Sequence, residues 1–324
     1  MRYRILLIIP VLLVSWTAAA RPGKRTREPR NQQVERTTAA APDVALSVCL
    51  GSGSLSVRGW DQNQVRVRSS DGLPIELSRP AGASNSAPAR ELAVVIVNML
   101  SKPRSSCLPF GDIELDVPRG ANLQLQTRDA DVSVSGVAGV KVVTQGGTVS
   151  IQRVTRVVDA TSIGGDISVQ DSRAAIKLHS VGGSIDARGV APGAAGDICE
   201  AGSVGGDISL AQISHGQVIV GTVSGDVSFS SSLARGGRYS FQAISGDLSL
   251  SLPADSSFRL NANLGQGSQV DSDFLLRSLL SAADKSDPLK KRGLGVQRIE
   301  AIYGTGEALI NLSYFGGSVE LRKK

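Results

Sequence analysis

The sequence predicts an all-β fold in which one domain forms a β-solenoid with coils of about 20 residues. Two observations lead to this prediction. A Gly-Gly-Asp or Ser-Gly-Asp corner recurs along the chain, and a short stretch of alternating apolar and polar residues follows each corner. A chain of 324 residues can form a single unit when it is built from repeats.

The corners follow one another at nearly constant spacing. The second glycines are Gly147, Gly165, Gly183, Gly206, Gly225 and Gly246. The steps between them are 18, 18, 23, 19 and 21 residues. Fainter copies lie at 53–57, 130–134 and 316–321, so the repeat extends through most of the chain.

The residue types at the corners have a chemical explanation. Glycine adopts the positive φ that a sharp reversal requires. An aspartate or serine after it can accept a hydrogen bond from a nearby backbone N–H and close the turn. Four aspartates occupy this position: Asp166, Asp207, Asp226 and Asp247. In stacked coils they would form an acidic ladder able to bind Ca²⁺, but Ser184 interrupts it and the known calcium repeat is spaced differently. We therefore expect structural turn residues, no metal ligand and no cofactor.

The alternation after each corner predicts strands, because side chains at every second position share one face. Residues 167–169 and 176–178 form such a pair within one repeat, and further second strands are expected at 140–142, 218–220, 239–241 and 258–260. Such short strands become stable when coils stack about 4.8 Å apart and bury a common core. The outward positions of the first strands are Ser168, Ser209, Ser228 and Ser249.

Two segments interrupt the pattern. Residues 80–109 are rich in proline and small residues, and we expect one extra strand at 92–97. Residues 274–283 space leucines as in a helix, so an insert at about 275–295 is expected to cap the last coils.

The N-terminus predicts export. Arg2 and Arg4 precede an apolar run at 5–14, and Ala18-Ala19-Ala20 fits a cleavage site before Arg21. The run is too short for a membrane anchor, which is the alternative interpretation. We expect a signal peptide at 1–20, a disordered basic linker at 21–43 and the solenoid domain at 44–324. The protein would then be periplasmic, on the cell surface or secreted.

The net charge of +6 comes from the N-terminal region. Residues 1–36 contain 8 Lys and Arg against 2 Asp and Glu, which leaves 27 of each sign in residues 37–324. No nucleic-acid partner is expected from this distribution.

Three cysteines are present in a chain expected to leave the reducing cytosol, so a disulfide is chemically allowed. The odd number leaves at least one cysteine without an intramolecular partner. Cys49 and Cys107 both lie in the irregular N-terminal third, whereas Cys199 lies among the regular repeats. We expect Cys49 to pair with Cys107.

Several segments resemble a known family. They are Gly-Ser-Leu-Ser-Val-Arg-Gly-Trp-Asp at 53–61, Val-Arg-Val at 65–67, Ile-Glu-Leu-Asp-Val-Pro-Arg-Gly at 113–120, the Ser-Gly-Asp corners, and the closing segment from 303–306 to 315–317. Over roughly residues 44–324 the chain resembles the "putative adhesin" family, an exported bacterial adhesin-like domain of unknown function. The resemblance implies a right-handed parallel β-helix and a role in the cell envelope or at the surface, and it supplies no catalytic residues. The insert around 275–295 departs from the family.

Catalysis has little support in the residues. His179 and His215 lack metal-ligand neighbours in sequence, and we expect both at the surface. Trp60 is the one tryptophan outside the predicted signal and is expected to seal one end of the core. Two hypotheses remain. One is a non-catalytic envelope or surface protein that presents a solenoid face to an unknown envelope protein or polysaccharide. The other is a polysaccharide lyase or hydrolase, which would need Asp, Arg or Lys clustered on the middle coils, where Lys177 and Arg188 stand isolated.

Overall fold

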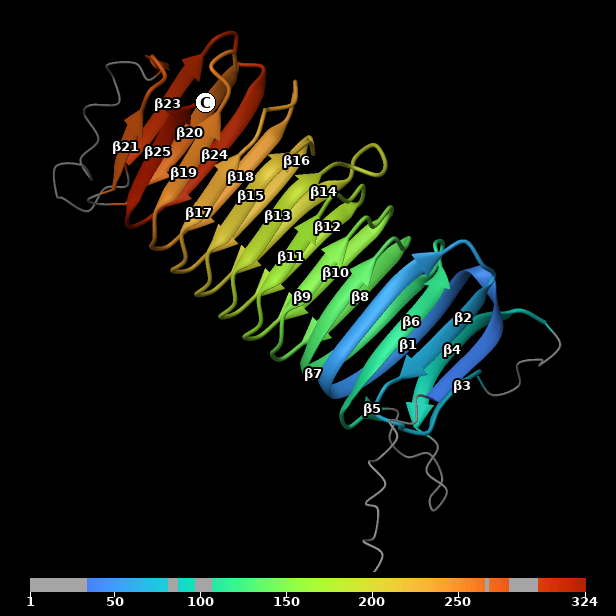
Figure 1. Ribbon diagram of the computed structural model, residues 1–324. Helices are drawn as coiled ribbons and strands as arrows, with labels where there is room; N and C mark the ends of the chain where they lie inside the picture. Colours follow the sequence, from blue (N-terminus) through green and yellow to red (C-terminus); the bar gives the residue numbers. More distant parts are fainter. Residues whose placement is uncertain (1–33, 81–86, 97–106, 266–267, 280–296) are drawn as a thin grey trace, which may run out of the picture. The chain divides into compact units, whose positions relative to one another are not determined.

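The computed structural model describes residues 34–80, 87–96, 107–265, 268–279 and 297–324. These residues contain 25 β-strands and no helix, and the strands belong to one hydrogen-bonded sheet that is mostly parallel. Figure 1 shows the described strands between residues 34 and 324 stacked side by side along one direction. The predicted signal peptide and its cleavage site lie outside the described residues.

Two series of strands form the middle of this body. The first series contains β8 (Gly139–Thr144), β10 (Val157–Ser162), β12 (Ala175–Ser180), β14 (Ile198–Ser203), β16 (Gln217–Thr222) and β18 (Arg238–Ala243). The second series contains β9 (Val149–Gln152), β11 (Ile167–Gln170), β13 (Ile185–Val190), β15 (Ile208–Ile213), β17 (Val227–Ser230) and β19 (Leu248–Leu252). Strands of the two series alternate along the chain, and a Gly-containing corner joins each first-series strand to the next second-series strand.

From β8 to β17, each strand pairs in parallel with the strand two positions later, so two strands make one coil. The register places equivalent residues of successive repeats side by side. Ser162 pairs with Ser180, for example, and Ile167 pairs with Ile185. In this solenoid-like arrangement, strands occupy the positions predicted at 140–142, 218–220, 239–241 and 258–260.

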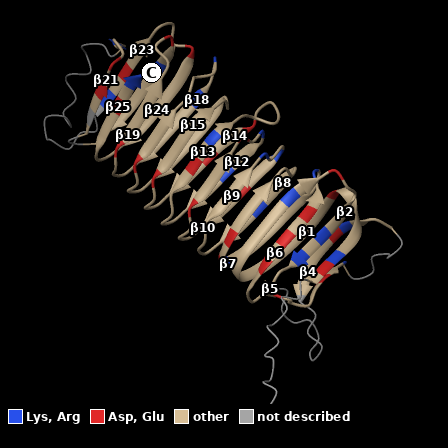
Figure 2. Ribbon diagram, viewed as in Figure 1, with Lys and Arg blue, Asp and Glu red and all other residues tan. Residues whose placement is uncertain are grey.

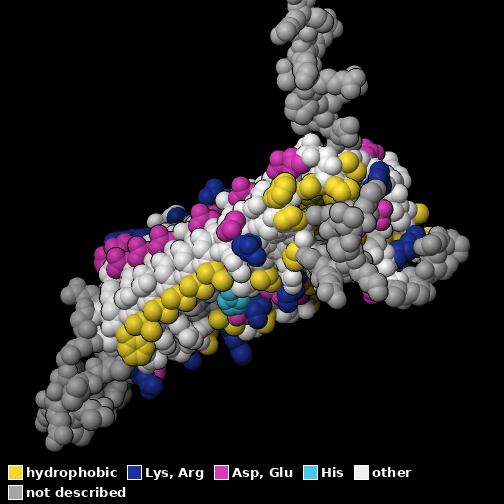
Figure 3. All heavy atoms as spheres, turned by 90° about the horizontal axis from the view of Figure 1, so that it is seen from below, with side chains coloured by type: hydrophobic (Ala, Val, Ile, Leu, Met, Phe, Trp, Pro, Cys, Tyr) yellow, Lys and Arg dark blue, Asp and Glu magenta, His cyan; other side chains and the backbone are white. Residues whose placement is uncertain are grey.

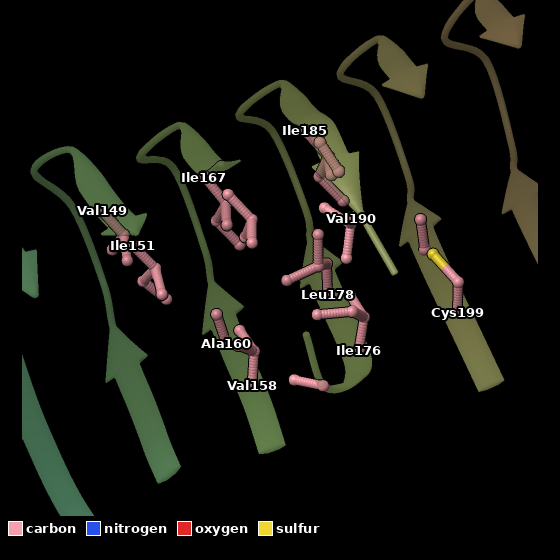
Figure 4. Packing of buried hydrophobic residues seen from close by; sticks show 14 of the residues in the cluster. Val149, Ile151, Val158, Ala160, Ile167, Ile176, Leu178, Ile185, Val190 and Cys199 are labelled. Carbon is pink, nitrogen blue, oxygen red and sulfur yellow. The ribbon is translucent and has the colours of Figure 1, made fainter. Parts of the chain in front are cut away.

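The core lies between the two series. Apolar side chains at every second position of each strand are buried, as in Val158 and Ala160 of β10 and Ile176 and Leu178 of β12. Figure 4 shows these side chains pointing into the space between the series, with Ile167 approaching from β11. The predicted outward serines are partly or fully exposed, in agreement with the alternation.

The N-terminal strands depart from simple sequential stacking. They are β1 (Val34–Trp60), β2 (Gln64–Ser69), β3 (Ile75–Ser78), β4 (Ala89–Ile96), β5 (Cys107–Leu108), β6 (Gly111–Pro118) and β7 (Asn122–Ser135). Strand β1 lies between β7 on one side and β4 and β6 on the other. Strand β2 pairs antiparallel with β6, and β3 pairs antiparallel with β4. The coil outside β1 is therefore formed by β4 and β6, which come later in the chain.

The C-terminal strands also change order. They are β20 (Phe258–Leu264), β21 (Gln269–Ser272), β22 (Arg277–Ser278), β23 (Gln297–Tyr303), β24 (Ala308–Tyr314) and β25 (Ser318–Lys323). Strand β24 lies between β18 and β20, and β25 lies between β19 and β21. The last coil of the sequence is therefore inserted into the stack, and antiparallel β23 and β22 follow beyond β20.

Three boundary predictions can be compared with the structure. The helix expected at 274–283 is wrong for its described part, because residues 274–279 contain only β22, which is held by pairing to β23. Residues 280–295 of the insert lie outside the described residues. Strand β1 begins at Val34, within the predicted linker, because residues 34–39 pair antiparallel with β2. The extra strand expected at 92–97 is β4, although residue 97 is not described.

Candidate functional site

The corners stack so closely that their second glycine has no room for a side chain. A Cβ on Gly206 would lie 2.1 Å from the carbonyl oxygen of Gly183, and one on Gly183 would lie 2.2 Å from that of Gly165. Among the six predicted corner glycines only Gly147 and Gly246 have positive φ. The positive-φ explanation is therefore wrong for the other four, where close stacking between coils excludes a side chain.

The corner aspartates link neighbouring coils. Oδ1 of Asp166 accepts the backbone N–H of Ser184 at 2.8 Å, one coil further along. Asp207 accepts the N–H of Asp226 at 2.9 Å, and Asp226 accepts that of Asp247 at 2.8 Å. The predicted hydrogen bond to a backbone N–H is present, but it joins two coils instead of closing one turn.

Buried hydroxyl groups that sequence reasoning missed close the turns. Ser162 Oγ accepts the N–H of Gly165 at 2.8 Å, Ser203 Oγ accepts that of Gly206 at 2.9 Å, and Thr222 Oγ1 accepts that of Gly225 at 3.0 Å. Each hydroxyl stands three residues before its glycine. The signal was present in the sequence as a Ser or Thr at this fixed distance.

The corner aspartates take part in two shifts of pKa. We call these residues, Asp166, Asp207, Asp226 and Asp247, the acidic edge. Hydrogen bonds from the backbone N–H and then the hydroxyl of Ser318 hold the pKa of Asp247 below its usual range. Burial raises the pKa of Tyr314 to about 12, and the charges of Asp247 and Asp226 add to this shift. Within the described ranges, no three His, Cys, Asp or Glu side chains gather in a group that could hold a metal ion.

A row of exposed apolar side chains runs beside the corners, and sequence reasoning missed it. The residue directly before each Gly-Gly or Ser-Gly pair points outward, because the strand alternation turns the preceding Ser, Thr, Ala or Tyr inward. The six members, which we call the apolar row, and their exposed fractions are Ile163 (55%), Val181 (50%), Val204 (47%), Val223 (41%), Ile244 (57%) and Phe315 (60%). Figure 3 shows a continuous apolar line of this kind parallel to a line of acidic groups.

A groove lies along one end of the apolar row. It has a volume of about 300 Å³, and Val223, Ile244 and Phe315 are among its lining residues. Gly221 and Gln242, from the outward face of β16 and β18, also line the groove. A Cβ on Gly221 would meet nothing within 4 Å, so neither steric crowding nor positive φ requires glycine there.

Charged side chains of both signs gather instead at the N-terminal strands (Figure 2). The carboxyl of Asp116 on β6 is buried and accepts hydrogen bonds from Arg58, Arg66 and Arg68, the shortest being 2.6 Å from Arg66. Burial raises the pKa of Asp116, but the hydrogen bond and charge of Arg66, followed by those of Arg58, outweigh it and place the pKa below its ordinary value. The cluster joins three arginines to one buried carboxylate and so links β1, β2 and β6.

The structure joins Cys49 and Cys107 in a disulfide between strands β1 and β5, with Cα atoms 4.4 Å apart. Cys199 is a buried free thiol whose pKa burial raises to about 12. A buried thiol of this kind is a core residue and not a nucleophile.

The two histidines have different environments. His179 is partly exposed, and its Nε2 lies 3.4 Å from Glu200 Oε1. The prediction of a surface position is wrong for His215, which is fully buried and has its Nε2 2.9 Å from the carbonyl oxygen of Ala174. Burial lowers the pKa of His215, so its neutral ring fills part of the core.

Trp60 does not seal the core. It is half-buried on β1, its Nε1 donates to the carbonyl oxygen of Gln64 at 2.8 Å, and Arg66 stacks 4.7 Å from its ring centre.

Among the described residues, no helix is long and apolar enough to cross a bilayer.

The chain is similar to several solved structures. One is described as a "putative adhesin" from Parabacteroides merdae, with a TM-score of 0.49, 8% identity, and coverage of 91% of this chain and 98% of that chain. Another is described as a "putative lipid binding protein" from Parabacteroides distasonis, with a TM-score of 0.48, 11% identity, and coverage of 91% and 98%.

A third is described as a "putative cell adhesion protein" from Clostridium sporogenes, with a TM-score of 0.23, 10% identity, and coverage of 90% and 100%. No family profile matches the sequence, and no curated protein is significantly similar to it. The adhesin resemblance noted in the sequence thus recurs among the descriptions of solved structures.

Proposed function

We propose that this chain is a non-catalytic binding or structural protein of the cell envelope or cell surface, adhesin-like, which presents one long face of a right-handed parallel β-helix to a protein or polymer. The observation that carries the proposal is the apolar row, whose six exposed side chains occupy the same position in six neighbouring coils. Parallel connections between strands of one sheet are nearly always right-handed, which supports the proposed hand.

The surface composition supports binding over catalysis. Soluble proteins rarely expose contiguous apolar patches larger than a few hundred Å², and larger ones mark interaction sites. A lyase or hydrolase would need charged groups around a cleft on the middle coils. Lys177 and Arg188 face outward on β12 and β13, in different series of strands. Lys177 is not isolated but lies in register between Asp159 and Glu200.

Export is part of the proposal. The predicted signal at residues 1–20 supports a periplasmic, surface or secreted location, and the Cys49–Cys107 disulfide suits an oxidising compartment.

Two measurements test the proposal. Cell fractionation with an antibody against the chain should recover it in the envelope or the medium with its N-terminus at Arg21. Recovery from the cytosol with residues 1–20 attached would contradict export. Incubation of the purified protein with uronic-acid polysaccharides and with cell-wall polymer should release no reducing ends or unsaturated products. Release that exceeds a heat-inactivated control would favour the lyase or hydrolase alternative.

A further inference from the structure

We infer that the apolar row and the neighbouring acidic edge together form a docking track for an amphipathic α-helix of a partner protein, one whose apolar seam is flanked on one side by Lys and Arg. This inference rests on the proposed binding function and specifies the surface and the chemistry of the partner.

The size of the apolar row fits a protein interface. The exposed fractions of its six members together equal about three complete side chains, which corresponds to a patch of several hundred Å². Five steps of about 4.8 Å give the row a length of about 24 Å. A helix of about 16 residues has that length, at 1.5 Å per residue.

The corner surface beside the apolar row allows a partner to approach closely. The first corner position is occupied by Gly164, Gly182, Gly205, Ser224 and Ser245 in five successive coils. A Cβ on Gly205 or Gly182 would have its nearest neighbour at 3.6 Å, so larger residues would fit there. The hydroxyls of Ser224 and Ser245 donate to carbonyl oxygens of the preceding coil at 3.1 Å and so turn toward the backbone. These five small residues therefore form a flat strip between the apolar row and the aspartates.

The exposed aspartates determine which charge is expected on one flank of the partner helix. Asp166, Asp207, Asp226 and Asp247 are exposed two positions beyond this strip. In the described part of the chain these four carboxylates accept backbone N–H groups and form no ion pair. A row of cations at the same spacing would complement them, whereas an anionic membrane surface would be repelled.

The backbone of the apolar row cannot pair with an added strand. The carbonyl oxygens of Val181, Val204 and Val223 accept N–H groups of the next coil at 2.8, 3.0 and 2.8 Å. The partner must therefore bind through its side chains, as a helix does when it lays its apolar face on a groove. The described residues of this chain contain no helix, so a second copy offers no such element from these ranges.

The groove at Gly221 supplies an anchor point. Its volume of about 300 Å³ accommodates one large side chain of the partner. Glycine in the middle of a strand is unfavourable and often marks a place where a ligand or another chain approaches. The open space above Gly221 agrees with that role, because β16 could carry a larger residue there without a clash.

A synthetic helix tests the inference. The probe is a fluorescein-labelled 18-residue peptide with a leucine seam and lysines along one flank, and its counterpart carries glutamates in place of the lysines. Fluorescence anisotropy with the full chain should give a Kd at least tenfold lower for the lysine peptide. The Val223→Ser/Ile244→Ser double variant and the Gly221→Val variant should each weaken its binding about tenfold. The Asp207→Asn/Asp226→Asn/Asp247→Asn variant should also weaken binding and reduce its dependence on salt.

Matched controls separate the track from general stickiness. Val143→Ser/Val157→Ser changes side chains that are 41% and 49% exposed on strands of the first series, outside the apolar row, and should leave the Kd unchanged. Gly216→Val adds a side chain in equally open space directly before β16 and should also leave the Kd unchanged. Circular dichroism and thermal unfolding of each variant show whether it is folded.

Three results would overturn the inference. They are equal binding of the two peptides, an unchanged Kd in the folded Val223→Ser/Ile244→Ser variant, and loss of self-association or of binding to anionic phosphatidylglycerol vesicles in that variant. The last result would assign the apolar row to a second copy or to a membrane. The proposed envelope function would survive any of them if the wild-type chain still fractionates with the envelope, so the two failures can be distinguished.

Discussion

At the scale of single residues, the corner glycines differ in the reason for their presence. The second glycine is excluded from substitution by the backbone of the previous coil, whereas the first glycine has ordinary space around it at Gly182 and Gly205. The sequence shows both glycines at four of the six corners and does not distinguish them. Only the distance between stacked coils separates a sterically required glycine from a replaceable one.

Substitution of neighbouring glycines tests this distinction. Gly206→Ala places its Cβ 2.1 Å from the Gly183 carbonyl oxygen and should lower the free energy of unfolding by about 1–3 kcal/mol. Gly205→Ala has its nearest atom at 3.6 Å and should change it by less than about 0.5 kcal/mol. Urea unfolding followed by circular dichroism measures both. Equal losses in the two variants would show that close stacking is not the reason for the second glycine.

The buried Asp116 should make stability depend on acid. Its pKa lies below the ordinary value of 3.8 in the folded state, so the ionised group stabilises the folded chain above the unfolded pKa. That contribution is lost as the pH falls from about 5 through the folded pKa. The Asp116→Asn variant should be less stable at pH 7 by about 1–3 kcal/mol and should lose less stability between pH 5 and pH 2. If the wild-type chain and the variant lose the same free energy of unfolding over that pH range, this account is contradicted.

At the scale of the structural element, the N-terminal coil depends on links that the repeat pattern does not contain. Strands β1 and β5 meet at Cys49 and Cys107, and β1, β2 and β6 meet at Asp116. Proximity in the irregular third suggested the cysteine pair from sequence. The arginine cluster escaped prediction, because Asp116 lies 58 residues after Arg58 and 50 after Arg66 and meets them only when β6 pairs with β1 and β2.

The cysteines allow a direct chemical test. In the folded, unreduced protein no thiol should react quickly with iodoacetamide, since Cys199 is buried and its pKa is raised to about 12. Unfolding without a reductant should expose one thiol, and reduction should expose three. The Cys49→Ser/Cys107→Ser variant should lose about 4 kcal/mol of stability in the chain-entropy model for a separation of 58 residues. Labelling of three thiols before reduction would rule out the disulfide.

At the scale of the whole described body, stability should be shared among coils that contact only their neighbours. The 18-residue steps from Gly147 to Gly165 and from Gly165 to Gly183 make these coils interchangeable in length. Stacked positions then carry equivalent residues, such as Val149, Ile167 and Ile185. The inserted coil of β24 and β25 is different, because it must contact coils that are separated from it in sequence.

Removal of one coil tests this modularity. Deletion of residues 147–164 joins Gly146 to Gly165 and should leave a folded chain, with β11 and β12 stacked on β7 and β8. The expected loss is about 1–3 kcal/mol for 18 residues at the usual stability per residue. Deletion of residues 147–155 removes only half a coil, turns the following strands to the wrong face and should abolish cooperative unfolding. Thermal unfolding monitored by circular dichroism distinguishes the two, and similar behaviour of both deletions would exclude a modular stack.

The sequence by itself determined the repeating coil, the strand positions and the core, because glycine spacing and apolar alternation are local and repeat in every coil. It also contained the apolar row, since Ile163, Val181 and Val204 each precede a Gly-Gly pair, but that pattern acquires meaning only when the coils stack. The tertiary structure alone decided the burial of His215, the insertion of β24 and β25, and the hydrogen bonds of the aspartates between coils. These features depend on which coils are neighbours, and that is set by long-range pairing which local patterns do not encode.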